Sequence, residues 1–176
     1  MVAGLDPETV LVGHSGAGAV VQGVADLMPE RLQRVVYVDS ETPPAGADLR
    51  PGLDPTVEEI PLPSWSELEA GGSSLLGLDE AMLAEFRERA VPHPAGPARD
   101  PTRLVNPARR QVPVTMVTTS YRASDVQRLA AEGHPFFAEL PNLRVDYFDL
   151  PTGHRPMWSR PRDLAAAAAE AAAAAV

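Results

Sequence analysis

Ser15, His154 and Asp39 are three residues of this sequence whose chemical types could work together in nucleophilic catalysis. A serine hydroxyl becomes a useful nucleophile when a neighbouring imidazole takes its proton, and that imidazole needs a carboxylate to fix its tautomer and stabilise its charged form. Each of the three residues follows closely on a run that is typical of a β-strand. Because the site of an open parallel sheet lies beyond the carboxyl ends of its strands, we expect the three side chains to converge there.

The residues around Ser15 read Gly13-His14-Ser15-Gly16-Ala17, which matches the G-x-S-x-G pattern of a sharp strand-to-helix turn except that alanine replaces the last glycine. Such a turn needs small residues because its helix packs closely on the preceding strand, and Gly18 adds another. We therefore expect Ser15 to be presented as a nucleophile. The alternative is that Ser15 only caps the helix.

The elements that must position these residues follow from the apolar patterning. Residues 9–12 and 34–38 are short apolar runs typical of buried parallel strands, and the helical pattern between them makes a βαβ unit. Further along we expect strands at 112–118 and 144–149, a helix over 124–133 with Ser124 as its N-cap, and a terminal helix from about residue 161. The predicted fold class is α/β, with a mostly parallel sheet flanked by helices.

Residues 40 to about 110 differ from the rest of the chain, being rich in proline, glycine and acidic residues. One helix is predicted there, from Asp79 to Arg89. We interpret residues 42–110 as a cap inserted over the edge of the sheet, and residues 1–176 as a single domain.

The composition restricts the partners of the protein. The net charge is -9 and the sequence pI is about 4.8, so no broad basic face is available for nucleic acid or for an anionic membrane surface. No stretch of about 18 apolar residues could span a bilayer, and the first residues lack the features of a signal peptide. We expect a cytoplasmic protein that binds a small molecule, and its oligomeric state is left open.

Cysteine and histidine usage argues against metal chemistry. The chain has no cysteine, which excludes disulfides and thiolate metal sites and is compatible with a reducing compartment. The four histidines never stand at metal-ligand spacing from one another. We therefore expect no metal and no other cofactor.

Several segments together resemble the α/β-hydrolase superfamily, most of all small bacterial esterase-like hydrolases related to plant methyl esterases and hydroxynitrile lyases. They are residues 10–18, Pro29-Glu30-Arg31, Val36-Tyr37-Val38-Asp39 and Leu150-Pro151-Thr152-Gly153-His154. The resemblance implies a serine hydrolase that cleaves a small carboxylic ester through an acyl-enzyme. It does not separate hydrolysis from perhydrolysis or cyanohydrin cleavage.

The same resemblance implies that family elements are missing before the Ser15 turn. Residues 1–5 resemble the end of the helix that precedes the strand of that turn, so the chain is similar to a member shortened by about 70 residues. The backbone amide of Gly16 is the implied oxyanion donor, and the second donor belongs to the missing part. A truncated, non-catalytic or ligand-binding relative is therefore the alternative function.

The acid partner of His154 has two main candidates, and Asp146 and Asp149 are remoter ones. In most family members it follows the strand before the histidine strand, where this chain has no carboxylate until Asp125. In a subset such as the haloalkane dehalogenases it follows the strand after the first helix, which is the place of Asp39 here. We expect Asp39 to be the acid, with Asp125 as the alternative, although Asp125 can also be a carboxylate in the first turn of a helix.

A substrate pocket is expected between the Ser15 turn and the cap. The side chains predicted to contact substrate are His14, Trp65, Met82, Phe86 and Met157. For each apolar residue taken singly, a place in the core is at least as good an interpretation. His14 could instead pack behind the turn.

Overall fold

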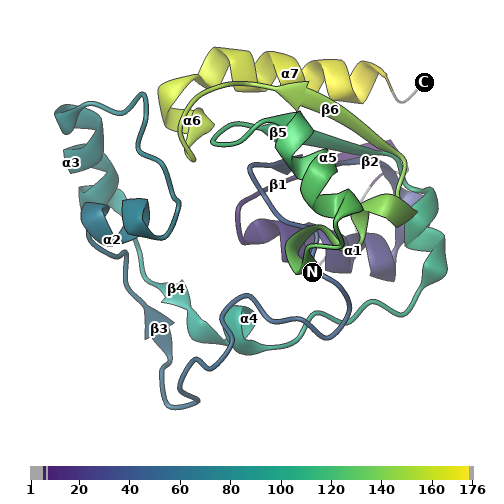
Figure 1. Ribbon diagram of the computed structural model, residues 1–176, viewed down its shortest axis with the longest axis horizontal. Helices are drawn as coiled ribbons and strands as arrows, with labels where there is room; N and C mark the ends of the chain where they lie inside the picture. The colour runs from purple at the N-terminus through teal and green to yellow at the C-terminus, as the bar shows by residue number, and fades with distance from the viewer. Residues whose placement is uncertain (1–5, 7, 175–176) are drawn as a thin grey trace.

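A computed structural model describes residue 6 and residues 8–174, and it contains the predicted parallel sheet (Figure 1). The helix end predicted in residues 1–5 lies outside the described residues. Four strands in the order β1-β2-β5-β6 pair in parallel throughout. They are β1 (Thr9–His14), β2 (Leu32–Val38), β5 (Val114–Thr118) and β6 (Val145–Asp149). Their carboxyl ends therefore share one edge of the sheet, and the predicted fold class is confirmed.

Helices cover both faces of this sheet (Figure 1). The side chains of β2 alternate between two apolar clusters, so that Val35 and Tyr37 pack with α1 and α5, while Val36 and Val38 pack with α7. All four are almost completely buried, which explains why this strand is a continuous apolar run. The three helices are α1 (Ala17–Leu27), α5 (Ala123–Ala131) and α7 (Pro161–Ala173).

The chain between β2 and β5 leaves the sheet and folds beside it before returning (Figure 1). Its elements are β3 (Glu59–Ile60), α2 (Trp65–Ala70), α3 (Glu80–Arg89), β4 (His93–Pro94) and α4 (Ala95–Arg99), with β3 and β4 paired antiparallel. The predicted helix at 79–89 is confirmed as α3, with Asp79 as its N-cap. The other elements were missed because they are too short for a periodic pattern, although the capping box formed by Ser64 and Glu67 marks the start of α2.

The start of α5 differs from the prediction. The N-cap is Arg122, so the assignment of Ser124 to that position was wrong. The carboxylate of Asp149, at the end of β6, accepts a hydrogen bond from the Ala123 N–H at 2.8 Å, and Asp125 accepts one from the Arg122 N–H at 3.3 Å. These carboxylates satisfy the first N–H groups of the helix, which a serine cap would otherwise do.

Short helical turns complete the chain. They are η1 (Pro29–Arg31), η2 (Pro107–Gln111), η3 (Pro135–Phe137), η4 (Leu140–Asn142) and α6 (Pro156–Ser159). Within residues 6 and 8–174, no helix combines the length and the apolar character that crossing a membrane requires.

Candidate active site

Ser15 lies in the turn between β1 and α1 with a positive φ of 52°, in the left-handed region that non-glycine residues seldom adopt. The Ser15 N–H donates to the carbonyl of Val38 at 3.1 Å, and the Ser40 hydroxyl donates to the carbonyl of Ser15 at 2.6 Å. These bonds from β2 and the loop after it hold the strained turn. The hydroxyl of Ser15 is thereby presented at the carboxyl edge of the sheet.

The glycines of the turn are required by close packing. A Cβ atom at Gly13 would lie 2.8 Å from Cγ1 of Val21, and one at Gly18 would lie 1.9 Å from the Ser40 hydroxyl oxygen. Residue 17, where alanine replaces the usual glycine, is exposed. Gly18 therefore provides the close approach between helix and loop, and the departure at Ala17 costs the turn nothing.

Asp39 follows β2 and is the most highly connected carboxylate of the site. It is 3% exposed and has a positive φ of 43°. One carboxylate oxygen accepts from the N–H groups of Thr119 and Ser120 at 3.1 and 3.0 Å, and the other accepts from the Ser120 hydroxyl at 2.5 Å and contacts Nδ1 of His154 at 2.7 Å. Burial raises the pKa of Asp39, but the hydrogen bonds from His154 and Ser120 outweigh it and hold the pKa at about 2.

His154 bridges Ser15 and Asp39. Its Nε2 lies 2.9 Å from the Ser15 hydroxyl oxygen, and its Nδ1 faces the ionised Asp39. A carboxylate can only accept, so Nδ1 carries a proton and Nε2 of the neutral ring is free to accept the serine proton. Ser15 and His154 are 139 positions apart in the chain, and the structure joins them with Asp39 in one line of hydrogen bonds. Such an arrangement can take the proton from a serine hydroxyl.

The loop that carries His154 is hydrogen-bonded to residues 74–76 of the segment between β2 and β5. The N–H of His154 donates to the Ser74 carbonyl at 2.8 Å, and the N–H of Gly153 donates to the Leu76 carbonyl at 3.0 Å. A Cβ atom at Gly153 would lie only 2.5 Å from the Leu76 oxygen, so glycine is needed for this approach. The backbone position of the imidazole therefore depends on both parts of the molecule.

His14 supports His154 from behind and does not line the cavity beside Ser15, where it was predicted to contact substrate. Its Nε2 lies 2.5 Å from the carbonyl oxygen of His154, which can only accept, so Nε2 carries the proton. Burial lowers the pKa of His14 to about 4, and the ring is neutral at pH 7. The two rings are 4.7 Å apart and tilted by 46°. His14 therefore contacts the backbone and the ring of His154 and is not among the residues that line the cavity.

A cavity of about 1080 Å³ opens beside Ser15, Gly16 and His154. Of the four apolar residues predicted to contact substrate, Phe86 lines it, whereas Trp65, Met82 and Met157 do not. Trp65 instead packs edge-on against Phe86 with ring centroids 5.8 Å apart, and Met157 is 38% exposed. Phe86 is the residue of α3 that lines the cavity, and neither α2 nor α3 has a continuous apolar face from which the inward side could be predicted.

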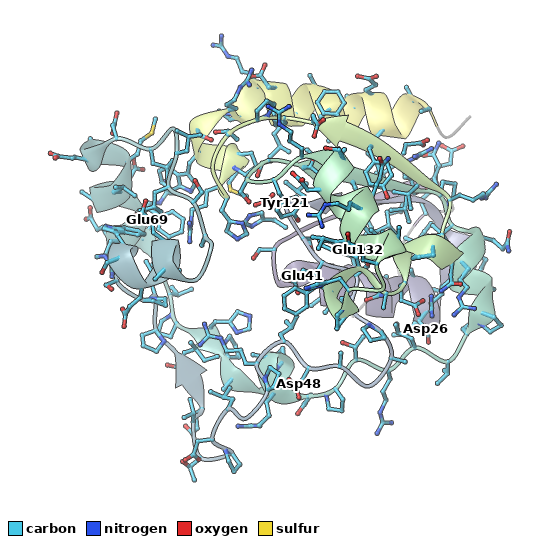
Figure 2. The ribbon with its side chains drawn as sticks, in the orientation of Figure 1. Asp26, Glu41, Asp48, Glu69, Tyr121 and Glu132 are labelled. Atoms are coloured by element: carbon cyan, nitrogen blue, oxygen red, sulfur yellow. The ribbon has the colours of Figure 1, made fainter. Side chains whose placement is uncertain are left out.

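The cavity also has polar walls that the sequence patterns did not indicate. Glu41 is half-buried, and burial raises the pKa of its carboxyl group. The Tyr121 hydroxyl donates to the carbonyl of Ser40 at 3.2 Å. Figure 2 shows Glu41 and Tyr121 on the side of the sheet that faces α2. Glu69 is labelled on α2 itself. Glu41 lies two residues beyond Asp39 and Tyr121 lies three residues beyond Thr118, so both follow strand ends closely. That position was the signal that could have identified them.

Asp125, the alternative acid, is among the residues that line the cavity, and its carboxylate caps α5. Asp39 is the carboxylate that pairs with His154. Thr119 and Ser120, at the position where most family members would have the acid, donate hydrogen bonds to Asp39 instead. Among the described residues, no group of three or more histidine, aspartate or glutamate side chains is arranged to hold a metal ion.

Comparison with known proteins finds one matching family and several solved structures with a similar fold. The model of the Alpha/beta hydrolase family matches residues 1–167. An extracellular α/β-hydrolase from a Paenibacillus species has a TM-score of 0.68 at 20% identity over 95% of this chain and 72% of that chain. A methylesterase from Arabidopsis has a TM-score of 0.65 at 18% identity over 98% and 73%.

A pyrethroid hydrolase from Sphingobium faniae has a TM-score of 0.62 at 20% identity over 98% of this chain and 74% of that chain. Identities this low support the fold alone. The chain spans about three quarters of the length of these neighbours. No curated protein sequence matches it significantly.

Proposed function

This chain belongs to the α/β-hydrolase family, and that membership supports a hydrolytic activity. We propose that it is a serine hydrolase that cleaves a small carboxylic ester through an acyl-enzyme. The supporting observation is the pair of contacts from the His154 ring, at 2.9 Å to the Ser15 hydroxyl oxygen and 2.7 Å to Asp39. The spacing is within the range that a nucleophile, its base and an orienting carboxylate require.

The proposed reaction begins when the Ser15 hydroxyl attacks the ester carbonyl carbon while its proton passes to Nε2 of His154. Asp39 stays ionised, since its pKa is about 2, and stabilises the imidazolium. The imidazolium then protonates the leaving alcohol, and a water molecule activated by the same imidazole hydrolyses the acyl-serine.

The negative oxygen of the tetrahedral intermediate needs hydrogen-bond donors. Gly16 directly follows Ser15 and lines the cavity at the start of α1, where the first N–H groups have no partner within the helix. We assign its N–H to this role. Removing one such donor in other hydrolases lowers turnover by about 10² to 10³-fold, so a second donor matters for the rate.

Residues 42–110 are proposed to form a cap that holds the substrate over Ser15, within a domain formed by the whole chain. Phe86, Leu49 and Leu62 from this segment line the cavity together with Ser15 and His154. A small ester also fits the names of two structural neighbours, a methylesterase and a pyrethroid hydrolase. A cytoplasmic location is retained as a prediction.

Labelling with a fluorophosphonate probe tests the function, because such probes react with an activated serine. We expect one adduct per chain, mapped to the peptide that contains Ser15 and absent in S15A. A para-nitrophenyl ester should be hydrolysed by the wild type and not by S15A. A thermal shift on adding small esters, with neither adduct nor product, would instead support the non-catalytic, ligand-binding alternative.

A further inference from the structure

Arg155 directly follows His154 and lines the same cavity as Ser15, yet it is only 7% exposed. A guanidinium group keeps its positive charge in proteins, and charged side chains are seldom buried without a partner of opposite charge. The partners of Arg155 therefore decide what it does in this cavity.

Two neutral groups hold its guanidinium in place. Nη1 donates a hydrogen bond to the Ser73 hydroxyl at 3.1 Å, and the guanidinium carbon lies 5.1 Å from the centre of the Phe86 ring. Phe86 is itself fixed edge-on against Trp158, with ring centroids 5.5 Å apart. Across the described part of the chain, no carboxylate lies within ion-pair distance of Arg155. Arg155 is thus an ordered buried cation with no carboxylate from residues 6 and 8–174 paired with it.

Three of the four carboxylates that line the cavity are engaged elsewhere. Asp39 pairs with His154 and Ser120, Glu67 closes the capping box of α2, and Asp125 caps α5. Glu41 has no such partner among the described residues, and burial raises its pKa, which favours the neutral carboxyl group. None of them supplies Arg155 with a fixed counter-charge.

Resting on the proposed esterase function, we propose that Arg155 binds a carboxylate carried by the substrate, so that the enzyme selects small esters with a free carboxylate group. A guanidinium presents five N–H donors in a planar fork that matches a carboxylate in a two-point contact, and Ser73 occupies one of its nitrogens. Since Arg155, Ser15 and His154 line the same cavity, this anchor would help to hold the ester of the substrate beside Ser15.

Two matched substrate pairs test the proposal. Mono-para-nitrophenyl adipate and para-nitrophenyl hexanoate place or omit the charge on the acyl side, and meta-acetoxybenzoate and its methyl ester do so on the alcohol side. The readout is the ratio of kcat/KM between charged and neutral ester within each pair, which does not depend on the fraction of active protein. We expect a ratio of about 10 or more in at least one pair for the wild type, since hydrogen bonds to charged groups are strong in a partly desolvated site.

Substitutions then assign the effect to one side chain. In R155Q the ratio should fall to about 1, and in R155K, which keeps the charge but loses the fork, it should fall at least threefold. R160Q is the matched control, because Arg160 is exposed and paired with Asp163, and its ratio should stay at the wild-type value. A wild-type ratio near 1 in both pairs would overturn the proposal. Arg50 is the other arginine among the residues that line the cavity, and a ratio that R50Q abolishes and R155Q leaves intact would overturn it as well.

Failure of the proposed function gives a different result. If neither pair is hydrolysed and Ser15 is not labelled, binding is measured by the thermal shift that adipate causes. A shift in the wild type that R155Q removes would support the anion site without catalysis, and no shift in the wild type would overturn it.

Discussion

The sheet and residues 42–110 differ in how deeply their side chains are buried. In the sheet, residues 35–38 of β2 are each at most 2% exposed, whereas α2 and α3 contain no buried residue. Figure 1 shows the corresponding difference in layout, with helices packed on the sheet and α2 and α3 standing apart from them. The side chains that must keep a fixed geometry come from the tightly packed region, while much of the cavity wall belongs to the loosely packed one. Recognition can then change while the chemistry is retained.

The two regions are not independent, because they meet at the loop of His154. Residues 74–76 accept hydrogen bonds from the N–H groups of Gly153 and His154, and Ser73 accepts one from Arg155. A motion of residues 42–110 would therefore move His154 as well as the cavity wall.

The largest effect is expected within the tightly packed region, at Asp39. D39N should lower kcat by about 10⁴-fold, because an amide can donate to Nδ1 of His154 and so favours the wrong tautomer. The variant D125N is the matched control and should stay within tenfold of the wild type, since Asp125 caps α5. Steady-state kinetics with a para-nitrophenyl ester compares them, and a larger loss in D125N would assign the acid to Asp125.

A smaller effect is expected from separating the two regions. In G153A the added methyl group would meet the carbonyl oxygens of Leu76 and Ser74 at 2.5 and 2.7 Å, so the base must shift. We expect kcat/KM to fall by about 10²-fold, since a displacement near 1 Å of a reacting group has that effect. The control is G23A, where a Cβ atom meets nothing within 4 Å. Equal rates for the two variants would show that this contact does not position His154.

The smallest effect concerns stability and arises at His14. Its folded pKa of about 4 lies below the ordinary 6.5, so between these pH values the unfolded chain binds more protons and the free energy of unfolding falls as the pH is lowered. The loss should be about 2 kcal/mol between pH 6.5 and pH 5. Urea denaturation at both pH values measures it.

In H14Q this part of the pH dependence should disappear, while H93Q, at an exposed histidine, should retain it. A pH dependence that is the same in H14Q and the wild type would contradict the burial of a neutral His14.

The features that could be predicted from the sequence are those fixed by local pattern and parallel topology. The apolar run of β2 predicted a strand buried on both faces, and the places of Ser15, Asp39 and His154 after strand ends predicted that they would meet. Both follow from the rule that parallel strands end at one edge.

The rest depends on contacts between distant residues. The donors to Asp39 come from Thr119 and Ser120, 80 and 81 positions away, and no local signal marks them. Phe86 of α3 lines the cavity and Met82 does not. The sequence does not reveal this difference, because a short helix without a continuous apolar face has no predictable inward side. His14 faces the His154 carbonyl because of the turn geometry, which the sequence pattern alone does not specify.

Trapping an acyl-enzyme would show whether Ser15 is the nucleophile. The wild type is mixed with para-nitrophenyl acetate, quenched in acid within the first turnovers and digested, and the acetylated peptide is identified by mass spectrometry. We expect one acetyl group on Ser15, absent in S15A and strongly reduced in H154A. Ester turnover by the wild type with no acyl group on Ser15, or undiminished turnover by S15A, would contradict it.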